Sequence, residues 1–179
     1  MQLAGQPLAE TITEGTEQQR KLGAQLLLSE VLEYVIYGLG VTPEVNGIAI
    51  TEPDAVKYTV SEKKADTLEM LDGLADVAYT MYWNANAFGL PLEEGFELVS
   101  QNNLEKFVEL ENWSDSSGEV QREAWHLGKD VHWPTEVSVV EVVHIEKEGH
   151  FAVGKDGAGK VRKPSHYKSV DLKPLVSVS

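Results

Sequence analysis

Hydrophobic residues recur at helical spacing over the first three fifths of the chain. Leucine, valine and isoleucine return every three or four positions over residues 17–38, and similar stripes follow over residues 61–88 and 91–109. Gly89 suits the end of the second stripe, and Pro91 suits the first turn of the third. Several helices joined by short connections predict a helical bundle.

The pattern changes after residue 111. Residues 112–133 are polar and mixed, and they carry three of the four tryptophans. Residues 135–153 are rich in valine and partly alternate, which is typical of strands. We therefore predict a mainly α protein, with a helical domain over residues 1–111 and a β-rich appendage with an extended C-terminal tail over residues 112–179.

Charge and composition narrow the classes of function. The net charge of −14 disfavours a general affinity for nucleic acid or for an anionic membrane. The chain has no cysteine, which excludes disulfides and thiolate chemistry within it. No apolar run reaches the roughly 18–20 residues of a membrane span, and the start lacks the basic and then apolar pattern of a signal peptide. We expect a cytoplasmic protein with no membrane partner and no nucleic-acid partner.

Carboxylates interrupt two of the apolar stripes at helical spacing. Glu69, Asp72 and Asp76 fall within an arc of about 60° on a helix, and Glu30 and Glu33 lie one turn apart in a more apolar segment. One interpretation is a solvated acidic stripe. The other is a hard divalent cation, because carboxylates in apolar surroundings need a partner and Mg²⁺ prefers oxygen ligands. If the two helices pack side by side, the two sets of carboxylates meet.

Three motifs together resemble a known family. The segments LLLSEVLE (residues 26–33), DGLADVAY (72–79) and VSQNNLEKF (99–107), followed by the tail GKVRKPSHYKSVDL (159–172), are similar in order and spacing to elements of the MazG-like nucleoside triphosphate pyrophosphohydrolases. The resemblance implies an all-α fold, a homodimer or homotetramer, and a housekeeping role in the nucleotide pool. The similar tails of phage members indicate a phage origin and action in the host cytoplasm.

The resemblance also implies the reaction and its residues. It implies Mg²⁺-dependent hydrolysis of a (deoxy)nucleoside triphosphate to the monophosphate and pyrophosphate, with Mn²⁺ as the alternative metal. Glu30, Glu33 and Asp76 carry over as metal ligands, and either glutamate is a candidate catalytic base. Asn103 and Lys106 carry over as contacts to the sugar or phosphates. The simpler interpretation is that Asn103 is a helix-terminus asparagine and Lys106 a surface lysine.

Two positions depart from the family pattern. Ser29 and Gly73 stand where the family has glutamate. Asp72 is a candidate to restore the second missing carboxylate, with help from Glu69 one turn earlier. Tyr79, one turn after Asp76, is a candidate to line the site, and the alternative is a place in the core.

Other classes of function stay open at this point. The two departures allow a non-catalytic nucleotide-binding or assembly protein on the same scaffold, and a purely structural α+β domain with an acidic face is a third hypothesis. Lys160, Arg162 and Lys163 in the tail either reach a phosphate or are solvated charges. Residues 112–153 fall outside the family pattern, and we expect them to cover the site, mediate assembly or bind a different ligand.

Overall fold

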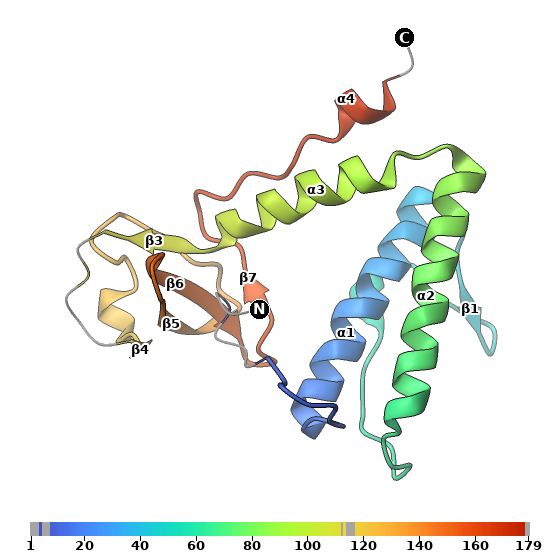
Figure 1. Cartoon of the computed structure of the whole chain (residues 1–179), viewed down its shortest axis with the longest axis horizontal. Coiled ribbons are helices and arrows are strands. Elements are labelled where there is room, and N and C mark those ends of the chain that lie inside the picture. Colours follow the sequence, from blue (N-terminus) through green and yellow to red (C-terminus); the bar gives the residue numbers. More distant parts are fainter. Residues whose placement is uncertain (1–3, 5–7, 112, 114–116, 178–179) are drawn as a thin grey trace. The chain divides into compact units, whose positions relative to one another are not determined.

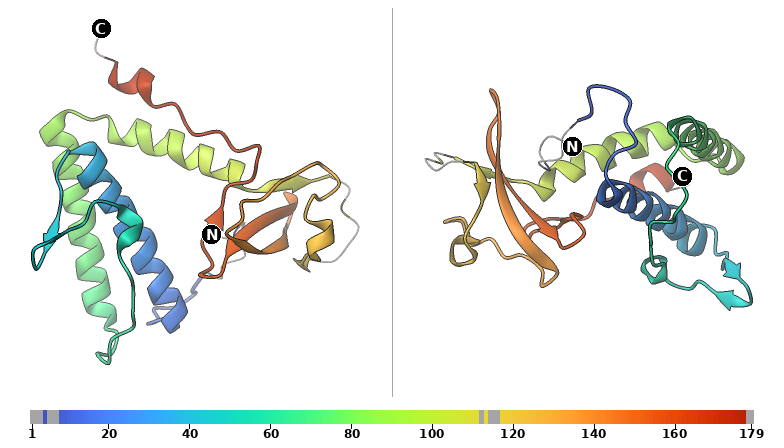
Figure 2. Two further views of the ribbon diagram at one scale, coloured as in Figure 1. Left: turned by 180° about the vertical axis from the view of Figure 1, so that it is seen from behind. Right: turned by 90° about the horizontal axis from the view of Figure 1, so that it is seen from below.

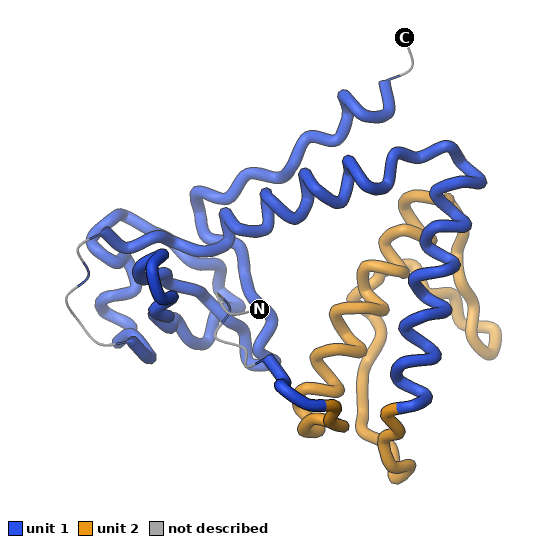
Figure 3. The backbone as a smooth tube through the Cα atoms, viewed as in Figure 1, with its two compact units in different colours: residues 1–11, 68–179 blue, residues 12–67 orange. Residues whose placement is uncertain are grey.

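The structure is a computed structural model, and it describes residues 4, 8–111, 113 and 117–177. Within these residues the chain forms four α-helices, seven β-strands and short 3₁₀ and π turns (Figure 1). Internal contacts divide the chain into two compact units, residues 12–67 and residues 1–11 with 68–179 (Figure 3). The smaller of the two is called the 12–67 unit and the other the larger unit.

The 12–67 unit begins with a capped helix. Helix α1 (Glu17–Glu33) opens with a capping box, in which Thr16 Oγ1 accepts from the Gln19 backbone N–H at 3.2 Å and Gln19 Oε1 accepts from the Thr16 backbone N–H at 2.7 Å. The helix runs directly into the π turn η2 (Tyr34–Gly38), where the backbone N–H of Leu39 donates to the Tyr34 carbonyl five residues back. This turn adds a residue to the last coil of the helix.

A small hairpin and a 3₁₀ turn complete the 12–67 unit. Strands β1 (Glu44–Val45) and β2 (Ile48–Ala49) pair around Asn46 and Gly47, whose φ angles of 51° and 77° are those of a tight hairpin turn. The 3₁₀ turn η3 (Pro53–Ala55) then packs against α1. It brings the acidic residues of the connecting loop back towards the end of that helix.

The main part of the larger unit, from residue 68 on, opens with two helices and a 3₁₀ turn. These elements are α2 (Thr67–Phe88), α3 (Leu92–Asn103) and η4 (Leu104–Lys106). Gly89, with φ of 64°, ends the first helix as predicted, and Pro91 is the N-cap of the second. Helix α2 starts six residues later than the 61–88 stripe predicts. Helix α3 stops earlier than predicted, because the chain turns into a strand at residue 108.

The rest of the larger unit is an antiparallel sheet (Figures 1 and 2). In the described residues its strand order is β3 (Val108–Leu110), β6 (Gly149–Asp156), β5 (Val137–Ile145) and β4 (Gly118–Glu119), and β7 (Val161–Arg162) also pairs with β6. The β5–β6 hairpin is its longest element and pairs Val137 with Asp156 at one end and Ile145 with Gly149 at the other. A 3₁₀ turn η5 (Arg122–Ala124) precedes β5, and a short helix α4 (Lys173–Val176) follows the tail.

The hydrophobic core lies in the sheet. Val140, Val142 and Ala152 are its most deeply buried residues, and Trp125 and Trp133 pack against the same cluster. The indole of Trp133 lies so close to Gly154 that a Cβ at that position would meet the ring at 2.4 Å. A glycine on a central strand is therefore required here by the close approach of a large side chain.

The prediction of a mainly α bundle is wrong. The five-stranded antiparallel sheet and the two-stranded hairpin make the protein mixed α and β. The periodic stripes do form helices, but among the described residues only Ser29 and Leu32 are buried on α1, Ala85 on α2 and none on α3. The valine-rich alternation builds the core, and the helices leave much of their apolar surface exposed.

Two further predictions concern the chain as a whole. The domain boundary at residue 111 stays a prediction, and parts of the two proposed domains, at both chain ends and at their junction, lie outside the described residues. Across the segments that the structure describes, no helix is both long enough and apolar enough to cross a membrane.

Candidate functional site

Two of the glutamates of α1 lie on its last turn. Glu30 and Glu33 are both exposed. Ser29 beside them is buried, with 2% of its surface exposed, and its hydroxyl donates to the Leu26 carbonyl at 3.3 Å. A glutamate at position 29 would bury a charge, which is costly without a partner. The carboxylates near the end of α1 are thus those of Glu30 and Glu33.

The π turn after α1 brings a tyrosine into an acidic group that the sequence did not predict. The hydroxyl of Tyr37 donates to Glu52 Oε2 at 2.9 Å. This hydrogen bond raises the pKa of Tyr37, and partial loss of hydration and the negative charges of Glu52, Glu33 and Asp54 act in the same direction. Glu52 therefore contacts the phenol directly, and Glu33 and Asp54 of the same unit add negative charge in its surroundings.

Sequence reasoning missed this group for a physical reason. Glu52 and Asp54 belong to the connecting loop and to η3, so no periodicity relates them to α1. The only available signal is that Tyr37 follows Glu33 by four residues, which is one helical turn. With Glu52, the acidic end of α1 extends beyond Glu30 and Glu33. The π turn at this end is also a feature that is frequent at functional sites.

The carboxylates of α2 share one side of that helix. Glu69, Asp72 and Asp76 are exposed and follow one another at spacings of three and four residues. Tyr79 continues the same side and is 72% exposed, which removes the alternative that it belongs to the core. A Cβ added at Gly73 would meet nothing within 4 Å, so the helix has room for the glutamate that the family pattern places there.

The predicted metal ligands belong to both units. Glu30 and Glu33 lie in the 12–67 unit, and Glu69, Asp72 and Asp76 lie in the larger unit. Among the residues described by the structure, no three His, Asp or Glu side chains are grouped closely enough to hold a metal ion. The carboxylates of each helix form an open acidic face, which suits Mg²⁺ because this ion is often held by one or two carboxylates together with water and substrate phosphates.

The predicted phosphate contacts lie where α3 ends. Asn103 is the last residue of α3 and Lys106 ends η4, and both are partly buried. The neighbouring Asn102 makes a contact that the sequence did not reveal, because its partners lie more than 60 residues away. Tyr167 Oη donates to Asn102 Oδ1 at 2.6 Å, and Asn102 Nδ2 donates to the Lys168 carbonyl at 2.8 Å. The C-terminal tail therefore returns to α3 and runs beside it (Figures 1 and 2).

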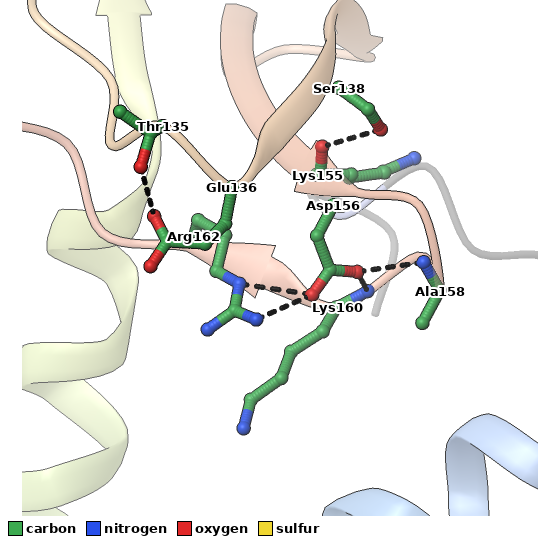
Figure 4. A network of polar contacts seen from close by, with 8 residues as sticks. All are labelled: Thr135, Glu136, Ser138, Lys155, Asp156, Ala158, Lys160 and Arg162. Atoms are coloured by element: carbon green, nitrogen blue, oxygen red, sulfur yellow. Dashed lines mark hydrogen bonds and ion pairs between the residues drawn. The ribbon is translucent and has the colours of Figure 1, made fainter.

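One of the basic residues of the tail has a structural partner. Arg162 Nε and Nη2 donate to Asp156 Oδ2 at 3.0 and 2.7 Å, while Asp156 Oδ1 accepts from the backbone N–H groups of Ala158 and Lys160, both at 2.9 Å (Figure 4). Asp156 thus ties together the turn between β6 and β7. Arg162 is engaged in this ion pair, which makes it a structural residue rather than a phosphate ligand.

Comparison with known proteins identifies no family for this chain. Neither a protein-family model, nor a curated protein, nor a solved structure matches it. The resemblance to MazG-like pyrophosphohydrolases stays a prediction from the quoted motifs.

Proposed function

We propose that the protein is a cytoplasmic, Mg²⁺-dependent hydrolase that converts a nucleoside or deoxynucleoside triphosphate to the monophosphate and pyrophosphate. The observation that carries this proposal is the acidic side of α2. Glu69, Asp72 and Asp76 project from a helix whose sequence contains no lysine or arginine. Like charges at this spacing destabilise a helix, and a bound divalent cation removes that repulsion.

The residues of the chain fit distinct roles in this reaction. Asp72 and Asp76 are the residues of the larger unit that would hold Mg²⁺ or Mn²⁺, and Glu30 and Glu33 are those of the 12–67 unit. The metal would neutralise phosphate oxygens and make a water molecule more acidic. Glu30 or Glu33, at the end of α1, would serve as the general base for the attacking water. Lys106 contributes positive charge to the phosphates, and Asn103 offers both a donor and an acceptor to the sugar.

The exposed apolar side chains of the helices support the proposed self-association. Leu68, Leu71 and Leu74 on α2 are all exposed, as are Phe96 and Leu98 on α3. Large exposed apolar patches mark interaction surfaces, and helices in water depend on packing of such faces for their stability. A homodimer or homotetramer in which a second copy covers these side chains accounts for them.

The proposal is tested by pyrophosphate release over a panel of nucleotides in the presence of Mg²⁺. We expect Asp76→Asn and Glu33→Gln each to lower release at least about 100-fold, because each removes a charge that acts on the phosphates or on the attacking water. Glu94→Gln is the matched control, since Glu94 is an exposed carboxylate in the first turn of α3 with no proposed role. Unchanged release in both Asp76→Asn and Glu33→Gln would remove these residues from the site.

One observation favours a second candidate function. Because Ser29 is buried, a family glutamate cannot occupy its position without burying a charge. A protein that lacks this ligand is a candidate for binding nucleotides without hydrolysing them. The two functions are separated by Gly73→Glu, which adds a carboxylate where the helix has room for it. An enzyme with a weakened metal site gains activity from this substitution, whereas a binding protein gains affinity for Mg²⁺ and triphosphate without releasing pyrophosphate.

A further inference from the structure

Two histidines face each other across the β5–β6 hairpin of the larger unit, near its turn. His144 on β5 and His150 on β6 are partners in the register of the sheet. Their ring centroids lie 4.6 Å apart, and the ring planes are tilted by 34°. The proposed hydrolysis uses neither residue, and imidazole is a common ligand of metal ions in proteins.

The pair lies at the end of the core face of the sheet. His144 follows the buried Val142 by two residues and His150 precedes the buried Ala152 by two, so all four side chains share one face. The buried Leu110 of β3 pairs with His150 on its other side. Because His144 is exposed and His150 is half-buried, the two rings are bounded by apolar residues and still open to an ion from solvent.

The ring nitrogens of this pair are available to a ligand. Within the residues that the structure describes, neither imidazole takes part in a hydrogen bond or an ion pair. Two other histidines are engaged, since His126 Nδ1 accepts from the Gly128 backbone N–H at 3.0 Å and His132 Nε2 lies 3.2 Å from Asp130 Oδ1.

We propose that His144 and His150 together bind a divalent transition-metal ion of the Ni²⁺, Cu²⁺ and Zn²⁺ class, with water in the remaining coordination positions. Imidazole nitrogen suits these ions, whereas Mg²⁺ prefers oxygen ligands, so this site is separate from the proposed magnesium site. A ring nitrogen binds such an ion at about 2.1 Å, so two imidazoles at a right or tetrahedral angle have centroids about 4.5–5.2 Å apart. The observed separation of 4.6 Å falls within this range.

The surroundings favour such an ion, and the ion in turn stabilises the hairpin. The turn between the two strands carries Glu146 and Glu148 against Lys147, in a chain with a net charge of −14. An ion held by both strands cross-links the hairpin, and its binding favours the folded chain because the unfolded chain does not hold the imidazoles together. With two protein ligands the site is more open than a closed structural zinc site, so we expect the ion to exchange with solvent.

The test is calorimetric titration of the tag-free chain with Ni²⁺, in an excess of Mg²⁺ so that carboxylate sites are filled. We expect one Ni²⁺ per chain, and at least about tenfold weaker binding in His144→Asn and in His150→Asn, because each removes one of the two protein ligands. His166→Asn is the matched control, since it removes an exposed imidazole of the tail and leaves the affinity unchanged.

Paramagnetic Ni²⁺ gives a second measurement that needs no variant. At substoichiometric Ni²⁺, the imidazole proton resonances of His144 and His150 should broaden before those of His126 and His166. Ni²⁺ should also raise the thermal midpoint of the wild type and leave that of His144→Asn unchanged.

The outcomes decide the metal site independently of the proposed function. No binding of Ni²⁺ by the wild type, equal affinity in the wild type and both pair variants, or simultaneous broadening of all four histidines would each overturn the site. The pair would then be a stacked cross-strand contact of the sheet. Pyrophosphate release with Mg²⁺ should be unchanged in His144→Asn, and its absence from the wild type overturns the hydrolase without affecting the Ni²⁺ result.

Discussion

Gly154→Ala should destabilise the sheet through a single methyl group. The new Cβ would lie 2.4 Å from Cε3, 2.7 Å from Cζ3 and 3.1 Å from Cδ2 of the Trp133 indole. The backbone at residue 154 is held on both sides, because it pairs with Val140 on β5 and with Arg162 on β7. The indole is also held, since its Nε1–H donates to the Trp125 carbonyl at 3.0 Å. Neither partner can move without losing contacts of its own.

The magnitude follows from these constraints. Overpacking of a filled core costs about 1–3 kcal/mol, and displacement of the indole adds about 1 kcal/mol if its hydrogen bond breaks. We therefore expect the free energy of unfolding to fall by about 2–4 kcal/mol. Urea unfolding followed by tryptophan fluorescence measures this as a lower midpoint with an unchanged slope.

A control variant and a coupled variant make this prediction specific. Gly157→Ala adds the same methyl group at the turn after β6, where nothing lies within 4 Å, and should change stability by less than about 0.5 kcal/mol. In the background Trp133→Leu, the Gly154→Ala substitution should cost much less, because the colliding ring is absent. Equal midpoints for wild type and Gly154→Ala, or the same cost in both backgrounds, would refute the packing argument.

Three further predictions concern the polar groups. Asp156→Asn should lower the free energy of unfolding by about 1–3 kcal/mol, since it removes the charge that pairs with Arg162 in the β6–β7 turn, and an unchanged thermal midpoint would contradict this. The pKa of Tyr37 is raised in the folded protein, so the protonated hydroxyl stabilises the folded state. This contribution to stability is complete at pH values below the pKa of about 10 in the unfolded chain. It is lost as the pH rises through the pKa of Tyr37 in the folded protein. Unfolding midpoints measured from pH 9 to 12 should therefore fall more steeply in the wild type than in Tyr37→Phe, and parallel curves would contradict the role of Glu52. Mg²⁺ or Mn²⁺ with a non-hydrolysable triphosphate should raise the thermal midpoint. A ligand at a concentration 100 times its dissociation constant adds about 2.7 kcal/mol to the free energy of unfolding. The absence of any shift in the midpoint would argue against a metal site.

The elements of this fold were easier to predict from the sequence than its core. The helical stripes and the punctuation at Gly89 and Pro91 correctly located α2 and α3, and the valine-rich segment correctly located β5 and β6. Periodicity reports which face of an element is apolar, but it does not report what covers that face. The bundle prediction failed because it assigned the core to the helices, whereas the described core is built on the sheet.

The sequence likewise predicted some features of the candidate site and missed others. The acidic residues of α1 and α2 could be predicted because helical spacing places them on one side of each helix. Two contacts could not be predicted from the sequence: that of Glu52 with Tyr37 and that of Tyr167 with Asn102. Each contact joins the end of a helix to an irregular segment that is distant in sequence. Strand β3 was missed for a simpler reason, because three residues carry too little alternation to end a predicted helix.

The most direct measurement of the central claim is the identity of the phosphorus products. The protein is incubated with a deoxynucleoside triphosphate and Mg²⁺, and the products are followed by ³¹P NMR. The account predicts resonances of pyrophosphate and of the nucleoside monophosphate, with no orthophosphate, and their absence in Asp76→Asn. Release of orthophosphate and a diphosphate, or no turnover across the nucleotide panel, would contradict it.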